Sequence, residues 1–219
     1  MSGVVRVWVA ELEPWWRRPP PPWLDPAEIR RSEALVGVQR RAVWVAGRVF
    51  VRAVLSAASG VPPAEVPLLA DARTGPRLSA SHTNLSISHA GTVIAVAVSA
   101  DVDLGVDLEP AGRLRGAADL DRLARTVLSP AESRRISPVG DDLADALLTS
   151  WVRKEAVVKA LRLGLQVPFG ALEVGPDGVV EGVPVDGRPL RVLDLALGAH
   201  LVGAVAAPPG REVAVTVVG

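Results

Sequence analysis

The feature that most restricts the fold of this chain is a helical pattern from Asp141 to Leu163, a stretch without proline or glycine. Its apolar residues recur at helical spacing, at Ala144, Leu147, Leu148, Trp151 and Val158. Steps of four residues place Leu147, Trp151, Glu155 and Lys159 on one slowly drifting stripe. Because this stripe begins apolar and ends in a carboxylate and an ammonium group, we predict a long core helix whose last turns reach a polar site.

The two lysines of the chain, Lys154 and Lys159, both lie in this helix, on either side of Glu155. The other 22 basic residues are arginines. Lysine carries a compact, strongly hydrated charge whereas arginine presents a planar fork, so the choice indicates a specific role for the two lysines. The alternative is an ordinary Glu–Lys pair on an exposed helix face, worth about 0.3 to 0.5 kcal/mol.

Composition excludes several classes of protein. The 219 residues suffice for one large domain or two small ones, and an apolar content of 49% argues against disorder. The absence of cysteine excludes disulfides, thiolate metal sites and a cysteine nucleophile. The chain has no signal-peptide layout and no apolar run of about 18 residues free of charge and proline, so we expect a soluble, cytoplasmic protein without a membrane segment.

The net charge of zero is a cancellation between two halves. Residues 1–100 carry 11 arginines against seven acidic residues, and residues 101–219 carry 13 basic against 17 acidic residues. One half therefore suits an anion and the other a cation, although an asymmetry of this size also arises by chance. It is too small to indicate binding to nucleic acid.

A helical region with an unusual set of arginines follows the first predicted strand, Val4–Leu12. Asp25 and Pro26 supply an N-cap and a proline at the first helical position, and the helical pattern continues to residue 59 with a break near Gly37. Steps of four align Arg40, Trp44, Arg48 and Arg52. These arginines indicate either an anion site or an ordinary exposed helix face.

A second informative stretch is Asp101–Glu109, in which acidic and apolar residues alternate as in a β-strand. Residues two apart on a strand share a face, so the carboxylates point the same way and repel one another unless a cation lies between them. Asp107 and Glu109 have the hard oxygen ligands that Mg²⁺ takes. We expect Asp101 and Asp103 to be turn residues that lead into the strand.

The remaining patterns complete an α+β fold. A hairpin is predicted over residues 85–88 and 92–99, its second strand buried on both faces, and helices are predicted over 116–128 and 129–136. Short strands are expected over residues 172–174, 179–181, 189–196, 200–206 and 212–218. Each half thus combines helices with short antiparallel strands, and we predict two lobes, residues 1–103 and residues 104–219.

Three blocks in this order are specific as a set: Ser86–Gly91 (SISHAG), Gly105–Glu109 (GVDLE) and Trp151–Lys159 (WVRKEAVVK). Together they resemble the 4′-phosphopantetheinyl transferases of the two-lobed, surfactin-synthetase-activating type. The likeness extends over about residues 25–175. Ser86, Ala90 and Val152 depart from the usual residues of the blocks, and Gly75-Pro76-Arg77 replaces a Gly-Lys-Pro, so Arg77 is interpreted as the substitute for that lysine.

The resemblance implies two similar lobes related by a pseudo-twofold axis, with an active site in the cleft between them. It implies a monomeric, Mg²⁺-dependent holo-[acyl-carrier-protein] synthase that transfers phosphopantetheine from coenzyme A to a serine of an acyl or peptidyl carrier protein, as in polyketide or nonribosomal peptide synthesis. Adenosine 3′,5′-bisphosphate is the other product. Breaking a diphosphate requires neutralisation of charge on its oxygens, which a metal ion and Lys159 can supply.

The resemblance also assigns roles to single residues. It implies Asp107 and Glu109 as metal ligands, with Glu155 either as a third ligand or as the base for the incoming hydroxyl; we favour the base. Lys159 acts in catalysis and on the diphosphate. The residues implied in coenzyme A binding, at its 3′-phosphate, adenine and diphosphate, are Arg40, Arg48, Arg52, Arg77, Ser88, His89, Lys154 and Lys159.

Two other hypotheses remain open. The substitutions at Ser86, Ala90 and Val152 allow a non-catalytic relative that binds coenzyme A or a carrier protein as an adaptor. An unrelated α+β protein with a decorative row of surface carboxylates would bind no coenzyme A. Mass spectrometry of carrier proteins and titration of coenzyme A distinguish the three.

Overall fold

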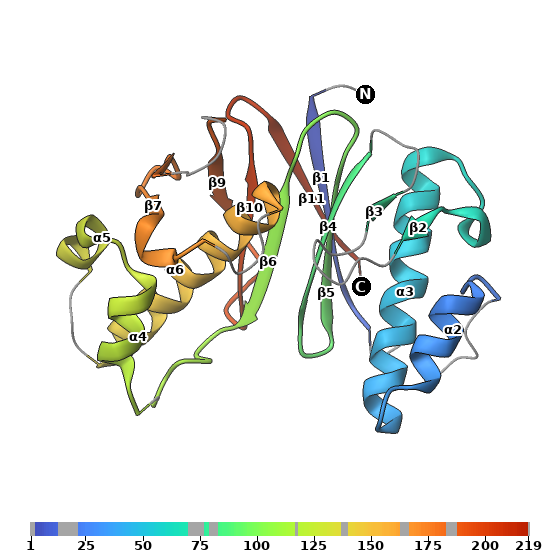
Figure 1. Cartoon of the computed structure of the whole chain (residues 1–219), viewed down its shortest axis with the longest axis horizontal. Coiled ribbons are helices and arrows are strands. Elements are labelled where there is room, and N and C mark those ends of the chain that lie inside the picture. The colour runs from blue at the N-terminus through green and yellow to red at the C-terminus, as the bar shows by residue number, and fades with distance from the viewer. Residues whose placement is uncertain are drawn as a thin grey trace.

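Two β-sheets pack face to face at the centre of the molecule, and each carries a long helix on its outer side (Figure 1). The computed structural model describes residues 3–12, 22–69, 77–78, 83–116, 118–136, 140–162, 167–182 and 188–218. The predicted α+β class with several antiparallel sheets is confirmed.

The helices are α2 (Pro26–Glu33), α3 (Val38–Ser59), α4 (Leu120–Val127), α5 (Pro130–Arg135) and α6 (Gly140–Leu161), with the short 3₁₀ helices η1 (Pro63–Glu65) and η3 (Phe169–Ala171). The strands of the two central sheets are β1 (Val4–Glu11), β4 (Asn84–Ala90), β5 (Val93–Ser99), β6 (Gly105–Pro110), β9 (Arg191–Asp194), β10 (Leu201–Ala207) and β11 (Glu212–Val218). Two small hairpins join β2 (Leu68–Leu69) to β3 (Arg77–Leu78) and β7 (Glu173–Val174) to β8 (Val180–Glu181).

The first sheet has the strand order β11-β1-β5-β4. Strand β5 is buried from Ile94 to Ser99, as the sequence predicted. The last strand of the chain, β11, pairs in parallel with the first, β1. A segment from the end of the sequence therefore completes the sheet built by its beginning, and the lobe boundaries 1–103 and 104–219 stay a prediction.

Helix α3 covers the outer face of the first sheet and buries Phe50, Val51 and Leu55 against it. It is separated from α2 at Gly37, whose φ of 97° lies in a region that glycine adopts readily, so the predicted break is confirmed. By length and composition alone α3 is apolar enough to cross a membrane, a test that the core helix of a soluble protein also passes.

The second sheet has the order β6-β10-β9 and packs against α6. The apolar side of α6, with Leu148, Val152 and Val157, is buried on this sheet, and its earlier part packs on α4 through Leu143 and Leu147. The long core helix predicted over residues 141–163 is thus confirmed.

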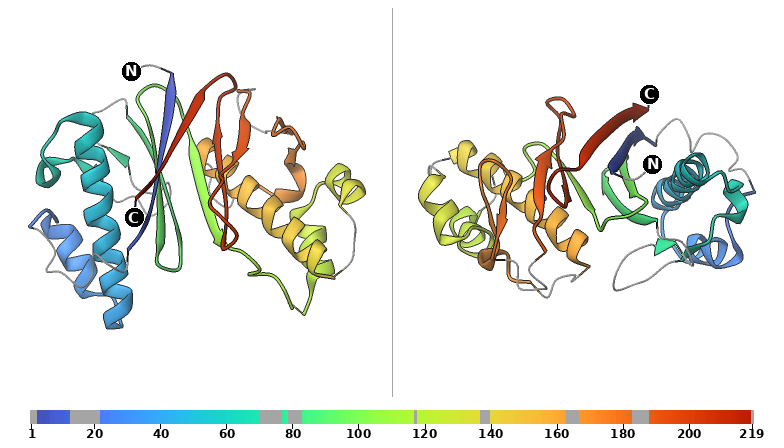
Figure 2. Two further views of the ribbon diagram at one scale, coloured as in Figure 1. Left: turned by 180° about the vertical axis from the view of Figure 1, so that it is seen from behind. Right: turned by 90° about the horizontal axis from the view of Figure 1, so that it is seen from above.

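The inner faces of the two sheets form a third core. Val5 and Val7 of β1 lie in it with Val106 and Leu108 of β6, all of them nearly inaccessible to solvent. Each such side chain contributes about 1.5 to 3 kcal/mol when fully buried. The two halves of the molecule are therefore joined through apolar side chains of both sheets. Figure 2 shows the arrangement of the two sheets from behind and from above.

Candidate active site

Strands β4 and β6 are edge strands of different sheets and lie side by side where the two halves meet (Figure 1). Two serine hydroxyls of β4 bridge them. Ser86 Oγ accepts the backbone N–H of Val106 at 3.0 Å, and Ser88 Oγ accepts that of Leu108 at 3.2 Å. A buried N–H is costly when unpaired, so these hydroxyls satisfy the edge of β6. This contact explains the serines of the first sequence block.

Asp107 is the centre of the polar cluster at this seam. Its Oδ1 accepts hydrogen bonds from Ser88 Oγ and from Lys159 Nζ, both at 2.7 Å. Lys159 Nζ also donates to the carbonyl oxygen of Val106 at 3.0 Å. The carboxylate is 5% exposed, and its Oδ2 has no hydrogen-bond partner within the described part of the chain. Serine, aspartate and lysine thus come together from β4, β6 and α6.

Gly105 allows α6 to approach β6 closely enough for this cluster to form. A Cβ atom at this position would lie 2.0 Å from the carbonyl oxygen of Ala156 and 2.6 Å from the backbone nitrogen of Ala160. Both distances are far shorter than van der Waals contact. The glycine of the second sequence block therefore fixes the position of the helix that carries Lys159.

The carboxyl groups of Glu155 and Glu109 lie close enough to Asp107 to be affected by its charge. Burial raises the pKa of Glu155, and repulsion from Asp107 raises it further, against the opposing attraction of Lys159. Burial likewise raises the pKa of Glu109, although its ion pair with Arg113 opposes the rise. A raised pKa makes Glu155 a stronger base than an ordinary carboxylate.

The three predicted metal ligands, Asp107, Glu109 and Glu155, are neighbours but do not form a closed ligand set. Over the described residues no group of three or more His, Cys, Asp and Glu side chains is placed to hold a metal ion. Glu109 is engaged by Arg113, and one oxygen of Asp107 by Lys159. The observation that suits a cation is the buried, unpaired Oδ2 of Asp107, a hard oxygen of the kind that Mg²⁺ takes.

A cavity of about 180 Å³ opens between α3 and the hairpin of β4 and β5. Its lining includes Trp44, Gly47 and Arg48 of α3 together with His89 of β4. The Arg48 guanidinium lies 5.1 Å from the ring centre of Trp44. Gly47 leaves room for the imidazole, because a Cβ there would lie 3.0 Å from His89 Nε2.

His89 is neutral at physiological pH. Its imidazole has an exposed edge at the mouth of the cavity, but the surrounding protein and the positive charges of Arg48 and Lys159 lower its pKa to about 4. His89 can therefore donate or accept a hydrogen bond to a ligand without adding charge.

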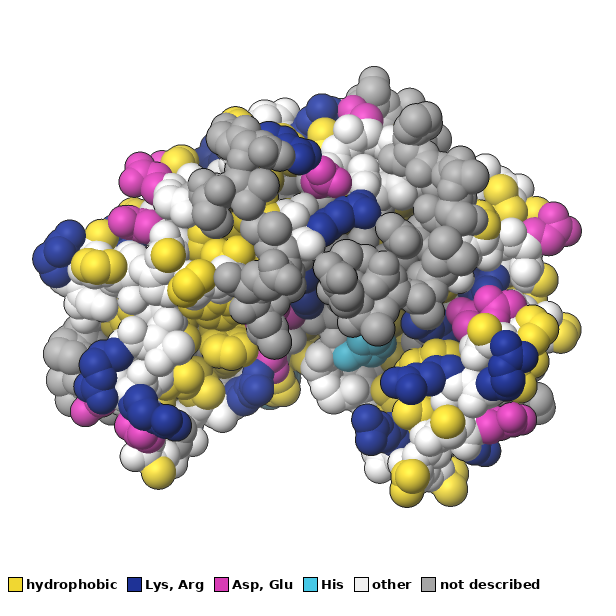
Figure 3. Space-filling model, viewed as in Figure 1, with side chains coloured by type: hydrophobic (Ala, Val, Ile, Leu, Met, Phe, Trp, Pro, Cys, Tyr) yellow, Lys and Arg dark blue, Asp and Glu magenta, His cyan; other side chains and the backbone are white. Residues whose placement is uncertain are grey.

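Of the other predicted binding residues, Arg40 is exposed in the first turn of α3 and Arg77 lies in β3. The side chain of Arg77 and the segment 79–82 fall outside the described residues, as do residues 15–21 of the tryptophan- and proline-rich segment. In the space-filling view, Lys and Arg side chains lie on both sides of the notch where the two halves separate (Figure 3).

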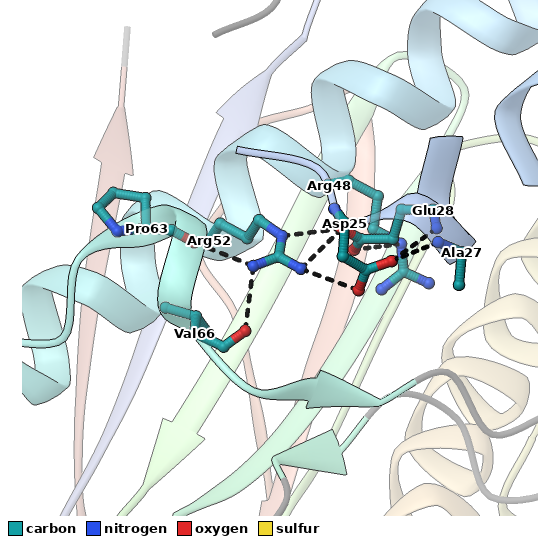
Figure 4. A network of polar contacts seen from close by, with 7 residues as sticks. All are labelled: Asp25, Ala27, Glu28, Arg48, Arg52, Pro63 and Val66. Atoms are coloured by element: carbon teal, nitrogen blue, oxygen red, sulfur yellow. Dashed lines mark hydrogen bonds and ion pairs between the residues drawn. The ribbon is translucent and has the colours of Figure 1, made fainter. Parts of the chain in front are cut away.

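Arg52 and Lys154 were predicted to bind coenzyme A, and the structure places both in the core. Arg52 is 1% exposed; its guanidinium donates to Glu28 at 2.9 Å and to the carbonyl oxygens of Pro63 and Val66 at 3.0 Å each. These contacts, with a further ion pair to Asp25 at 3.3 Å, are drawn in Figure 4. Arg52 therefore links α3 to α2 and to the segment around η1. Because its N–H groups are used in these contacts, they are not available to coenzyme A.

Lys154 is fully buried, and its three donors are matched by three acceptors. They are the carboxylate of Glu132 and the carbonyl oxygens of Val127 and Phe169. A lysine ammonium has three hydrogens to donate, so none is left for a ligand. The prediction that Lys154 binds coenzyme A is therefore not supported by its position, because a five-residue step turns it away from Lys159.

Glu28 and Glu132 carry these contacts and were not singled out from the sequence. Each is the third residue of a short helix with a capping box, begun by Asp25-Pro26 in α2 and by Ser129-Pro130 in α5. The sequence shows the two helix starts, Asp25-Pro26 and Ser129-Pro130. Nothing in it indicated that each glutamate also neutralises a buried base on the neighbouring long helix.

Comparison with known proteins agrees with the blocks at this seam. The family model of the 4′-phosphopantetheinyl transferase superfamily matches residues 103–183, which include both β6 and α6. Over that segment the chain is similar to this superfamily. It is also 28% identical over 147 residues to the 4′-phosphopantetheinyl transferase HetI of Nostoc sp. (strain PCC 7120 / SAG 25.82 / UTEX 2576), an alignment that covers 65% of this chain and 61% of HetI. The suspected family relationship is thus confirmed.

Proposed function

We propose that this superfamily member transfers 4′-phosphopantetheine from coenzyme A to a serine hydroxyl of an apo acyl or peptidyl carrier protein. In this reaction the serine oxygen forms a bond to the phosphorus that carries pantetheine. The bond between that phosphorus and the bridging oxygen breaks, and adenosine 3′,5′-bisphosphate leaves. The observation that carries the proposal is the convergence of Asp107, Lys159 and Ser88 from two sheets and one helix on a single polar cluster.

The side chains of the cluster suit this chemistry in distinct ways. Lys159 would neutralise a diphosphate oxygen, for which the ammonium must remain at the seam rather than in the core; its side chain is 30% exposed. Glu155, whose pKa is raised by burial, would accept the proton of the incoming serine. Ser88 holds Asp107 in place from the opposite strand.

Mg²⁺ is part of the proposal, with Asp107 and Glu109 as the residues that would hold it and Glu155 left as the base. When bound, the ion would supply positive charge to the non-bridging oxygens of the diphosphate. The unpaired Oδ2 of Asp107 is the feature that favours such a ligand, among the residues that are described. Glu109 would have to exchange its contact with Arg113 for the ion.

We further propose that the two lobes, residues 1–103 and 104–219, are related by a pseudo-twofold axis and enclose the active site as a monomer in the cytoplasm. The repeated arrangement of a capped short helix whose glutamate binds a base on a long helix, Glu28 with Arg52 and Glu132 with Lys154, supports the relationship. The cavity at His89 and Arg48 would receive the adenosine 3′-phosphate end of coenzyme A.

Mass spectrometry of intact carrier proteins tests the proposed reaction. Incubation of the protein with coenzyme A, Mg²⁺ and a panel of apo carriers should add one phosphopantetheine to at least one of them, and a chelator should prevent it. Glu155→Gln should abolish transfer while coenzyme A still binds, whereas the exposed control Glu212→Gln should be fully active.

Three outcomes would contradict the proposal, and the first two also separate its alternatives. Binding of coenzyme A without transfer to any carrier would favour the adaptor. No binding of coenzyme A at all would favour a protein unrelated in function to its family. Full activity of Glu155→Gln would remove the general base assigned to α6.

A further inference from the structure

Glu28 has one oxygen that the packing of α2 on α3 does not use. Its Oε2 accepts the backbone N–H of Asp25 at 3.0 Å and Arg52 Nε at 2.9 Å, which completes the helix cap and the buried ion pair. Its Oε1 is buried and has no hydrogen-bond partner among the described residues. Figure 4 shows this carboxylate between two arginines of α3, Arg52 and Arg48.

The unused oxygen faces Arg48. Glu28 Oε1 lies 3.9 Å from Arg48 Nε, a distance at which charges attract but no hydrogen bond forms. On its other side the Arg48 guanidinium lies over the ring of Trp44. Arg48 is thus held between a carboxylate and an indole, with its side chain 16% exposed, while it lines the cavity that also contains His89.

Arg48 is the side chain that can give this cavity a positive charge at neutral pH. Among the described lining residues the other titratable group is His89, which is neutral because its pKa is about 4. An anion in the cavity would therefore depend on the exact placement of one guanidinium. Arg48 is subject to two opposed forces, attraction by Glu28 and repulsion by the positive charge of Arg52.

We propose that Glu28 is a positioning residue that holds Arg48 in place to bind the 3′-phosphate of coenzyme A. The inference rests on the proposed function, because it takes the cavity as the site for that phosphate. Without the negative charge of Glu28, repulsion from Arg52 displaces Arg48 from the cavity wall. Glu28 acts through Arg48 and touches no ligand itself.

The second half of the molecule offers a matched comparison. Glu132 has the same place in a capping box and neutralises the buried Lys154, but both its oxygens are used. Oε2 accepts the backbone N–H of Ser129 at 2.7 Å, and Oε1 accepts that of Val174 at 3.1 Å. Glu132 therefore has the structural part of the role of Glu28 without a spare oxygen directed at a binding residue.

Calorimetric binding of two nucleotides tests the proposal without requiring turnover. The probes are adenosine 3′,5′-bisphosphate and adenosine 5′-monophosphate, which differ by the 3′-phosphate. Glu28→Gln keeps an oxygen for Arg52 and for the cap. It should raise the Kd of the bisphosphate about 5- to 10-fold and leave that of the monophosphate unchanged. Glu132→Gln should change neither Kd, although it lowers the thermal stability.

A double variant shows whether Glu28 acts through Arg48. In an Arg48→Met background, the further change Glu28→Gln should have no effect on the Kd of the bisphosphate. An equal loss for both nucleotides, an undiminished effect in the Arg48→Met background, or wild-type affinity of Glu28→Gln would each overturn the positioning role. If wild-type protein distinguishes the nucleotides but transfers nothing to a carrier, the proposed function fails and this inference stands.

Discussion

Each half of the molecule contains a buried ion pair between a short helix and a long helix, with arginine as the base in the first half and lysine in the second. Comparing the two pairs distinguishes charges that stabilise the fold from charges that can bind a ligand. In each half a glutamate from a short capped helix neutralises a base on the long helix: Glu28 with Arg52, and Glu132 with Lys154. Lys154 is enclosed completely, with three donors matched by three acceptors. Arg52 shares its partner with Arg48, 3.9 Å from the same carboxylate.

The difference teaches that burial of a base, rather than its place in a motif, decides what it does. The groups that remain available to a ligand stand next to the buried ones on the same helices. Lys159 follows Lys154 by five residues and Arg48 precedes Arg52 by four. Each long helix is therefore held by one buried base, while a second base of α6 lies at the seam and a second base of α3 lines the cavity.

The largest expected effect is on the enclosed pair. Lys154→Met should lower the free energy of unfolding by about 3 to 5 kcal/mol, because Glu132 would remain as a buried, unpaired charge. Urea unfolding followed by circular dichroism measures the loss. Addition of Glu132→Gln should recover part of it. A Lys154→Met protein as stable as wild type would show that the lysine is not a structural base.

The corresponding change in the first half should cost less. Arg52→Met should lower the free energy of unfolding by about 1 to 3 kcal/mol, since Arg48 can still compensate Glu28 and the Asp25 side chain is 38% exposed. The same urea experiment gives the value. A loss larger than that of Lys154→Met would contradict the view that the first-half pair shares its charge.

The close packing of helix α6 on strand β6 depends on Gly105 of that strand. Gly105→Ala should cost about 1 to 3 kcal/mol of stability and reduce transfer more than tenfold, because the new methyl group pushes α6 and Lys159 away from Asp107. Gly170→Ala is the matched control, since its Cβ would meet its nearest neighbours at 3.6 Å. Equal stability and activity of the two variants would contradict the close approach of β6 and α6.

The smallest effect concerns the carboxylates of the seam. A carboxyl group with a raised pKa in the folded state stabilises the protein below its ordinary pKa of 4.5, and this contribution is lost as the pH rises through the raised value. Glu155→Gln should therefore raise the melting temperature at pH 7 by about 1 to 3 °C, and the gain should disappear near pH 4.5. Calorimetric scans at several pH values, with Glu212→Gln as control, measure it. A lower melting temperature at pH 7 would contradict the repulsion inferred among these carboxylates.

Much of the fold followed from local pattern. The capped start of α2, the position of α5, the break at Gly37, the buried strand β5 and the long helix α6 were all predicted. The pairing of β11 with β1 was not, because a valine-rich alternation specifies a strand and its buried face but not its partner.

The sequence indicated which residue types the candidate site contains, but not which of the named residues are buried in the core. Asp107, Lys159 and Ser88 meet at the seam and His89 lines the cavity, while their roles in catalysis and binding stay predictions. The misplaced residues have a common cause in helical geometry. Five residues correspond to a turn of about 140° around a helix, and steps of four drift by about 40° each, so Lys154 and Arg52 point into the core.

The central claim, that Asp107 and its neighbours hold the diphosphate of coenzyme A with a divalent ion, is tested most directly by calorimetry. Coenzyme A should bind wild-type protein at least about 10-fold more tightly with Mg²⁺ than with a chelator, and Asp107→Asn should lose this increment. Equal affinity with and without Mg²⁺, or an undiminished increment in Asp107→Asn, would contradict it.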